Sequence, residues 1–156
     1  MILYTLHNNG YIDFSEKVKL FPKEKFNMYV NFTNRCNCNC TFCLRHLKDD
    51  HKLWLKDGEP SLEEIKQAFL NAPMENVADI VICGFGEPTM RLDDLVKLLT
   101  FLQQTYPSIK VRMNTNGLSD LEYGKKTAML FKGLLNTISI SLNESTSEKY
   151  LEVTRS

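Results

Sequence analysis

Most of the cysteines of this chain are crowded into one short segment. The sequence contains five cysteines, and four of them lie within eight residues. Those four are Cys36, Cys38, Cys40 and Cys43. Bridges over such short loops strain disulfide geometry, and the odd count leaves one thiol over, so the pattern does not predict a disulfide framework. Because the chain starts without an export signal, we expect the clustered thiols to be metal ligands.

Three of these cysteines, Cys36, Cys40 and Cys43, have the spacing C-x3-C-x2-C. Three thiolates on one tight loop can hold three corners of a cubane iron–sulfur cluster and leave the fourth iron open. Cys38 lies two residues from both Cys36 and Cys40, so we expect it to point away from the ligand side. The alternative is a structural zinc site formed by all four thiols, which the lack of a second, separated pair of cysteines disfavours.

Short apolar segments alternate with helical patterns along the rest of the chain. Strands are predicted at residues 26–32, 79–83, 109–113 and 137–142. Helices are predicted from Ser61, with Glu64 in capping-box spacing, at residues 92–102, more weakly at residues 128–135, and from Thr146. The polar segment 46–59 is predicted to be a loop that Trp54 and its leucine neighbours pack down. The alternation predicts parallel strands joined by right-handed helical crossovers.

The predicted fold class is therefore α/β, a partial (β/α) barrel of parallel strands preceded by a small β-hairpin. A full eight-unit barrel needs about 250 residues, whereas this chain has 156 residues and supplies four βα units. We divide it into a hairpin and connector at residues 1–26, with the turn at Asn9 and Gly10, and a core at residues 27–156. We expect the core to be incomplete at its C-terminal end, with an unpaired edge around residues 138–140.

Polar and glycine-rich residues follow each predicted strand. The cysteines follow the first strand, residues 84–88 (GFGEP) the second and residues 114–117 (NTNG) the third, while Ser139, Ser141 and Asn143 end the fourth. In parallel α/β folds, ligands bind at the carboxyl ends of the strands. We therefore expect a shared site at this edge of the sheet. Within it, Glu87 either orders the turn or takes part in the chemistry, and we favour the ordering role.

The overall composition narrows the class of protein. Lys plus Arg and Asp plus Glu each total 19, so the formal net charge is zero. This balance argues against a broad phosphate-binding face. No segment approaches the roughly 18 continuous apolar residues of a membrane span, and the first residues lack the pattern of a signal peptide. We therefore expect a cytoplasmic protein that does not enter a membrane.

These motifs resemble those of the radical S-adenosylmethionine (SAM) superfamily from about residue 27 to residue 156. Residues 34–43 are similar to its cysteine signature, including the aromatic Phe42 before the last cysteine, and GFGEP is similar to its GGEP motif. More narrowly, residues 31–45, 53–55 (LWL), 84–88 and 133–143 resemble the TatD-associated radical SAM proteins. That group is named for gene neighbourhood with a TatD-type nuclease. Phe85 in place of a glycine and the extra thiol of Cys38 depart from the superfamily pattern.

The resemblance implies roles for particular residues. Cys36, Cys40 and Cys43 would bind a [4Fe-4S] cluster, whose open iron would chelate the amino and carboxylate groups of SAM. The backbone at Gly84, Gly86 and Glu87 would receive the SAM amino group, and Asn116, Ser141 and Asn143 would lie near its ribose or methionyl part. Arg155 would pair with the SAM carboxylate, unless it is only a solvated charge. The resemblance identifies no catalytic residue.

The resemblance also implies an activity. A one-electron donor such as a flavodoxin or ferredoxin would reduce the cluster, SAM would be cleaved to a 5′-deoxyadenosyl radical, and the radical would abstract hydrogen from a substrate that the motifs do not identify. A functional link to a TatD-type nuclease is a further expectation. One alternative is an activase whose substrate is a glycine of a partner enzyme. Another is a zinc-stabilised binding module without catalysis.

Overall fold

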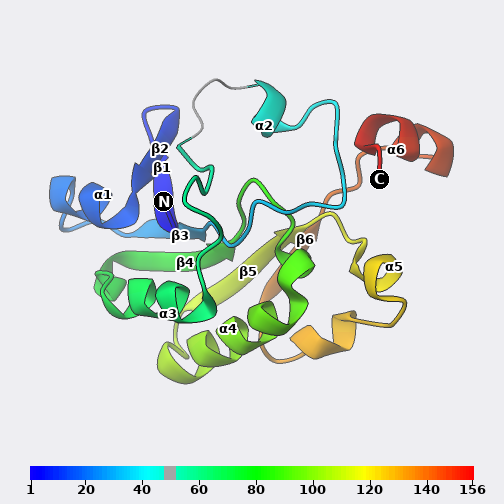
Figure 1. Cartoon of the computed structure of the whole chain (residues 1–156). Coiled ribbons are helices and arrows are strands. Elements are labelled where there is room, and N and C mark those ends of the chain that lie inside the picture. Colours follow the sequence, from blue (N-terminus) through cyan, green and yellow to red (C-terminus); the bar gives the residue numbers. More distant parts are fainter. Residues whose placement is uncertain (48–51) are drawn as a thin grey trace.

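The computed structural model describes residues 1–47 and 52–156, and these form one six-stranded sheet with helices packed against it (Figure 1). The strand order is β2-β1-β3-β4-β5-β6. The strands are β1 Leu3–His7, β2 Gly10–Asp13, β3 Phe26–Val30, β4 Val77–Ile82, β5 Lys110–Thr115 and β6 Thr137–Ile140. Strands β3 to β6 are parallel, and β1 is antiparallel to both β2 and β3. The predicted α/β class, a partial barrel of parallel strands after a hairpin, is confirmed.

The N-terminal hairpin extends the same sheet as the parallel strands, because β1 pairs with β3. Its turn differs by one residue from the prediction. Asn8 and Asn9 have φ angles of 47° and 61°, and Gly10 already pairs with His7 in the ladder. Two left-handed residues form the tight turn that suits the twist of a hairpin, and asparagine tolerates this conformation. A helix that was not predicted, α1 (Phe14–Leu20), follows the hairpin, and the Asp13 side chain caps it.

Two amphipathic helices, α3 (Leu62–Leu70) and α4 (Leu92–Thr105), cover one face of the sheet (Figure 1). The predicted capping box of α3 is present, because Ser61 Oγ accepts from the N–H of Glu64 at 3.2 Å and the Glu64 carboxylate accepts from the N–H of Ser61 at 2.7 Å. The helices bury their apolar faces against alternate residues of the central strands. The buried strand residues include Met28, Val30, Ile80, Ile82, Val111 and Met113.

The opposite face of the sheet has a smaller buried cluster. It contains Tyr4, Leu53 and Phe85. Leu53 and Leu55 are 2% and 8% exposed, whereas Trp54 between them is 39% exposed. The leucines of the predicted loop therefore pack down, but the tryptophan does so only in part. Residues 48–51 of that loop lie outside the described residues.

The C-terminal part departs from the prediction in one helix. The segment predicted as a weak helix at residues 128–135 forms only the 3-10 turn η3 (Ala128–Phe131), and Gly133 then has a φ of 78°. A short helix, α5 (Ser119–Tyr123), precedes it. Strand β6 lies at the edge of the sheet as expected, with Ile138 40% and Ile140 66% exposed. The helix α6 (Ser147–Thr154) begins after its Thr146 cap as predicted.

Three short elements complete the fold: α2 (Leu44–Leu47), and the 3-10 turns η1 (Met74–Asn76) and η2 (Pro88–Arg91). Helix α2 follows the cysteine-bearing loop, and η2 begins at Pro88, the last residue of the GFGEP segment. Across residues 1–47 and 52–156, none of the helices combines the length and apolar character that a membrane crossing requires.

Candidate functional site

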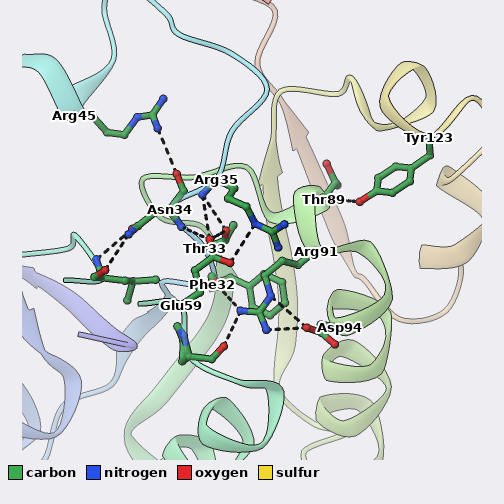
Figure 2. A network of polar contacts seen from close by, with 12 residues as sticks. Phe32, Thr33, Asn34, Arg35, Arg45, Glu59, Thr89, Arg91, Asp94 and Tyr123 are labelled. Atoms are coloured by element: carbon green, nitrogen blue, oxygen red, sulfur yellow. Dashed lines mark hydrogen bonds and ion pairs between the residues drawn. The ribbon is translucent and has the colours of Figure 1, made fainter. Parts of the chain in front are cut away.

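The chain enters the cysteine loop, residues 31–43, through a set of anchoring contacts (Figure 2). The Glu59 carboxylate accepts from the Thr33 hydroxyl, from the N–H of Asn34 at 3.1 Å and from Arg35 Nε at 3.2 Å. Burial opposes ionisation of Glu59, but the hydrogen bonds and the Arg35 charge outweigh it and lower the pKa of this carboxyl. Glu59 therefore holds the three residues before Cys36 as a charged acceptor.

Two further residues fix the same stretch of backbone. The Asn34 amide donates to the Leu55 carbonyl at 3.1 Å and accepts from the Leu55 N–H at 3.2 Å. Arg91 donates to the carbonyls of Phe32 at 3.0 Å and Pro60 at 2.7 Å, and Asp94 pairs with it at 2.7 Å (Figure 2). The start of the loop is thus tied both to the segment before α3 and to the start of α4.

Arg45 lies in α2, two residues after the end of the loop, and its side chain turns back onto the loop. Its guanidinium donates to the Asn34 carbonyl at 3.4 Å and the Cys38 carbonyl at 3.2 Å, and its Nε lies 3.4 Å from Cys43 Sγ. These contacts join the first and last thirds of the loop. They also put a fixed positive charge beside the Cys43 sulfur.

The GFGEP turn after β4 packs directly on the backbone that precedes Cys36. A side chain at Gly86 would overlap the carbonyls of Thr33 and Arg35, so only glycine fits there. The N–H of Glu87 donates to the Arg35 carbonyl at 2.7 Å. The absence of a side chain at residue 86 therefore allows the second strand end to hydrogen-bond to the cysteine loop.

The Glu87 side chain orders the ends of two strands. Glu87 is 4% exposed. One carboxylate oxygen accepts from the Thr89 N–H at 3.1 Å, the Thr89 hydroxyl at 2.9 Å and the Thr115 hydroxyl at 2.7 Å, and the other accepts from the Asn116 N–H at 2.7 Å. Four donors of the chain itself occupy the carboxylate, which is the arrangement expected of an ordering role.

Asn116, at the end of β5, reaches the cysteine loop with its side chain. Its Nδ2 donates to Asn37 Oδ1 at 2.7 Å and lies 3.4 Å from Cys38 Sγ. Asn37 in turn donates to the Glu122 carboxylate of α5 at 3.2 Å. The loop is therefore held by β5 and by the helix that follows it.

The last turn of α6 holds the middle of the loop. The N–H groups of Asn39 and Thr41, on either side of Cys40, donate to the carbonyls of Thr154 and Val153, both at 2.9 Å. The end of a helix leaves such carbonyls without partners in the helix itself. Arg155 follows as the left-handed cap of α6, with a φ of 51°, and its side chain is exposed.

The four clustered thiols differ in environment. Cys38 is 4% exposed, and burial raises the pKa of its thiol to about 12, with the neighbouring Cys36 and Cys40 adding to the rise. Cys36, Cys40 and Cys43 are half-buried. Burial also raises the pKa of Cys36, while the N–H of Cys38 and the charge of Arg45 oppose that rise. The most enclosed thiol is the one outside the C-x3-C-x2-C spacing.

The cysteine loop fits an iron–sulfur cluster in the chemistry of its donors, since it carries three half-buried thiols in the C-x3-C-x2-C spacing. Among residues 1–47 and 52–156, no group of three or more His, Cys, Asp or Glu side chains is gathered as a ligand set. Binding of a cluster would therefore have to draw the three thiols together.

The other predicted site residues divide into two groups. Gly86, Glu87 and Asn116 lie with the cysteine loop, as described above, and Gly84 packs against Asn31, the first residue of that loop. Ser141 continues the pairing of β6 with β5, because its N–H donates to the Thr115 carbonyl at 3.0 Å, but its side chain is exposed. Asn143 lies beside Tyr150 of α6, whose pKa burial raises. Arg155 follows Val153 and Thr154, whose carbonyls accept from the cysteine loop, and its own side chain is exposed.

Three residues that shape this site were not predicted from the sequence: Glu59, Arg91 and Arg45. Glu59 precedes a helix cap and Arg91 precedes an amphipathic helix, positions where charged residues are ordinary. The arginine two residues after Cys43 was the one local signal, since a cation beside clustered thiols lowers the cost of ionising them. The partners of Glu59 and Arg91 become evident only in three dimensions.

Comparisons with known proteins match most of the chain. The model of the Radical SAM superfamily matches residues 30–156. A GTP 3′,8-cyclase of Paenarthrobacter nicotinovorans is 29% identical over 140 residues, which are 88% of this chain and 37% of that protein. A 7,8-dihydro-6-hydroxymethylpterin dimethyltransferase of Methanocaldococcus jannaschii is 33% identical over 128 residues, 78% of this chain and 23% of that protein. A probable GTP 3′,8-cyclase of Thermococcus kodakarensis is 29% identical over 135 residues, 86% of this chain and 40% of that protein. The chain thus spans less than half the length of these curated relatives.

Proposed function

The chain belongs to the radical SAM superfamily, and from that membership we propose that it acts in the reductive cleavage of SAM, with hydrogen abstraction from a substrate. Members of the superfamily generally use a [4Fe-4S] cluster and SAM, and the relatives named above are enzymes. Their names describe different reactions, a cyclisation and a methyl transfer, so we assign neither substrate to this chain.

The observation that carries the proposal is the contact between the cysteine loop and the GFGEP turn. The Glu87 N–H donates to the Arg35 carbonyl at 2.7 Å, next to Cys36, and Gly86 makes that approach possible. We propose that Cys36, Cys40 and Cys43 hold the cluster. Cys38 stays outside the ligand set because its buried sulfur already faces the Asn116 amide.

Cys36, Cys40 and Cys43 would hold the cluster, which when bound and reduced would supply one electron for cleavage of the SAM carbon–sulfur bond to methionine and a 5′-deoxyadenosyl radical. The chain's own groups bind and orient. The backbone at Gly84, Gly86 and Glu87 would receive the SAM amino group, with Asn116, Ser141 and Asn143 near the ribose or methionyl part. Arg155, at the exposed end of α6, would pair with the SAM carboxylate.

Two finer assignments belong to the same proposal. The motifs of residues 31–45 and 133–143 favour the TatD-associated group of the superfamily, with a functional link to a TatD-type nuclease. A flavodoxin or ferredoxin would serve as the one-electron donor. Both follow from the sequence resemblance.

The test is anaerobic reconstitution of the full chain with iron and sulfide. We expect about four iron and four sulfide per chain, a change in the EPR signal of the reduced cluster on adding SAM, and formation of 5′-deoxyadenosine and methionine with dithionite. A variant with Cys36, Cys40 and Cys43 all changed to Ala is the control and should bind no cluster.

Two results would contradict the proposal, and a third would change its substrate. About one zinc per chain held by all four thiols would support the zinc-stabilised module instead. A full, reduced cluster whose EPR signal does not respond to SAM would reject SAM binding by this chain. If SAM cleavage required a partner enzyme and left a glycyl radical in that partner, the activase alternative would replace hydrogen abstraction from a small substrate.

A further inference from the structure

The sheet face opposite α3 and α4 carries a row of aligned residues that the proposed SAM site does not use. In the strand register, Tyr29 of β3 pairs with Val81, Val81 with Arg112, and Arg112 with Thr137. One step closer to the carboxyl ends of the strands, Asn114 pairs with Ser139. Register partners point to the same face of a sheet. The neighbouring residues, such as Ile82 and Met113, point to the other face and enter the helix-covered core.

Arg112 brings to this face a half-buried, charged side chain whose Nε–H lacks an acceptor among the described residues. Its Nε is buried, and within residues 1–47 and 52–156 it has no hydrogen-bond partner. The salt bridges found in that part of the chain involve other residues. A buried donor without an acceptor destabilises the folded state, so such groups are rare unless something else binds to them. The planar guanidinium suits a carboxylate or phosphate, which it can bind with two parallel hydrogen bonds.

Asn114, two residues further along β5, has a buried acceptor, Oδ1, that lacks a donor in the described part of the chain. Its side chain lies against Cys83, whose thiol also contacts the Tyr4 side chain. An unpaired acceptor two residues from the unpaired Nε–H of Arg112 indicates that the missing ligand carries a hydroxyl or amine donor as well as an anionic group.

Tyrosine rings form one side of the same face. The Tyr4 ring stacks on Tyr29 with centroids 5.4 Å apart, and the Tyr11 ring meets Tyr4 edge-on at 5.5 Å. Of these, Tyr29 is next to Val81 in the row that leads to Arg112. The rings give a rigid apolar wall beside the polar groups, which is the usual composition of a small-molecule site.

We propose that Arg112 and Asn114 form the polar end of the substrate site, and that the substrate is a small molecule with a carboxylate or phosphate group and a hydroxyl or amine donor. This inference rests on the proposed function. Arg112 lies four residues before Asn116, which is about 13 Å along a strand at about 3.3 Å per residue. A metabolite anchored at Arg112 therefore extends toward the strand ends, where hydrogen abstraction would occur.

The test follows the Nε–H signal of Arg112 by ¹H–¹⁵N NMR in the full chain at constant ionic strength. Inorganic phosphate and lactate are the two probes, one for each anion chemistry. We expect a saturable shift of the Arg112 signal, and the probe that saturates at lower concentration identifies the preferred group. Arg112→Gln should weaken the binding of that probe at least ten-fold, measured by shifts of neighbouring backbone amides. Lys110→Gln, which removes an exposed charge from the same strand, should change it less than two-fold.

An Arg112 signal that shifts linearly with both probes, or not at all, overturns the inference. This result is obtained on the unmutated chain, so it does not depend on whether a variant folds. Equal losses in Arg112→Gln and Lys110→Gln also overturn it, because they indicate only general charge attraction. The experiment is run with and without the reconstituted cluster. If Arg112 responds but SAM is not cleaved, the proposed function fails and the anion site stands. If SAM is cleaved but Arg112 does not respond, only the present inference fails.

Discussion

The backbone N–H of Asn116 donates to the Glu87 carboxylate at 2.7 Å, which ties the end of β5 to the turn after β4. The same two residues also hold the cysteine loop. The Glu87 N–H donates to the Arg35 carbonyl, and the Asn116 side chain donates to Asn37. These bonds close a ring through two strand ends and the loop. The position of the loop is therefore set by groups that belong to the sheet, which is a rigid support.

Glu87→Gln should destabilise the folded chain, although the side chain keeps its size and shape. A glutamine has one accepting oxygen, so its NH₂ would face either Asn116 or the threonine donors. We expect the free energy of unfolding in urea to fall by about 2–3 kcal/mol. The control Glu75→Gln changes an exposed residue and should stay within about 0.5 kcal/mol of the parent. Unchanged stability together with lost SAM cleavage would assign Glu87 a chemical role instead.

Asn116→Ala should loosen the cysteine loop. Loss of the bond to Asn37 leaves the loop with fewer anchors, and the amides of Asn39 and Thr41 should exchange with solvent roughly five- to ten-fold faster. Hydrogen–deuterium exchange of the SAM-free chain measures this directly. Asn71→Ala, at the exposed end of α3, is the matched control and should leave both amides as they are. Parent-like exchange in Asn116→Ala would show that the bond between Asn116 and Asn37 does not hold this part of the loop.

Cys38→Ala should keep the cluster. The Cys38 sulfur is buried against Asn116, so its loss removes packing and leaves the three thiols of the C-x3-C-x2-C spacing in place. After anaerobic reconstitution, the visible iron–sulfur absorbance should stay near the parent level. The single Ala variants of Cys36, Cys40 and Cys43 should each lose most of it. A bleached Cys38→Ala protein beside a coloured variant of one of the other three would make the ligand assignment wrong.

Arg155→Gly separates backbone strain from SAM binding. Arg155 has a φ of 51°, a conformation that costs a residue with a side chain roughly 1–2 kcal/mol and glycine almost nothing. The SAM-free chain should therefore gain about 1 kcal/mol in thermal or urea unfolding. Arg155→Ala keeps the strain and should not gain stability. If Arg155 pairs with the SAM carboxylate, both variants should bind SAM more weakly, whereas parent-like affinity in both would leave Arg155 a solvated charge.

Glu59→Gln should change how stability depends on pH. The pKa of Glu59 lies below its ordinary value of 4.5 in the folded chain. Such a group stabilises the fold above its ordinary pKa, and this contribution is lost as the pH falls through the lowered value. At pH 7 the variant should be less stable by about 1–2 kcal/mol, and the difference should shrink toward pH 3. A difference that stays constant over this range would rule out the charge of Glu59 as the cause.

Local patterns in the sequence were sufficient for most of the fold. The four parallel strands were predicted to within two residues at each end, so that Asn114 and Thr115 lie inside β5 and not after it. The capping box of Ser61 and Glu64 and the start of α6 after Thr146 were predicted correctly. Each depends on side chains within about four positions along the chain, so a short window contains the needed information. The errors arose where two local solutions compete. The hairpin turned at Asn8 and Asn9, and residues 128–131 formed a 3-10 turn in place of a longer helix.

The sequence by itself determined which residues are available for the chemistry: three thiols in the C-x3-C-x2-C spacing and a glycine-rich turn at the end of a neighbouring strand. Only the tertiary structure decided what positions them. Asn37 and Asn116 are 79 residues apart, and Thr41 and Val153 are 112 apart, yet each pair is in contact. Such pairs depend on strand register and helix packing, which every residue of the core helps to set. No short segment encodes them, because a hydrogen bond between distant residues forms only after the sheet has brought their backbones together.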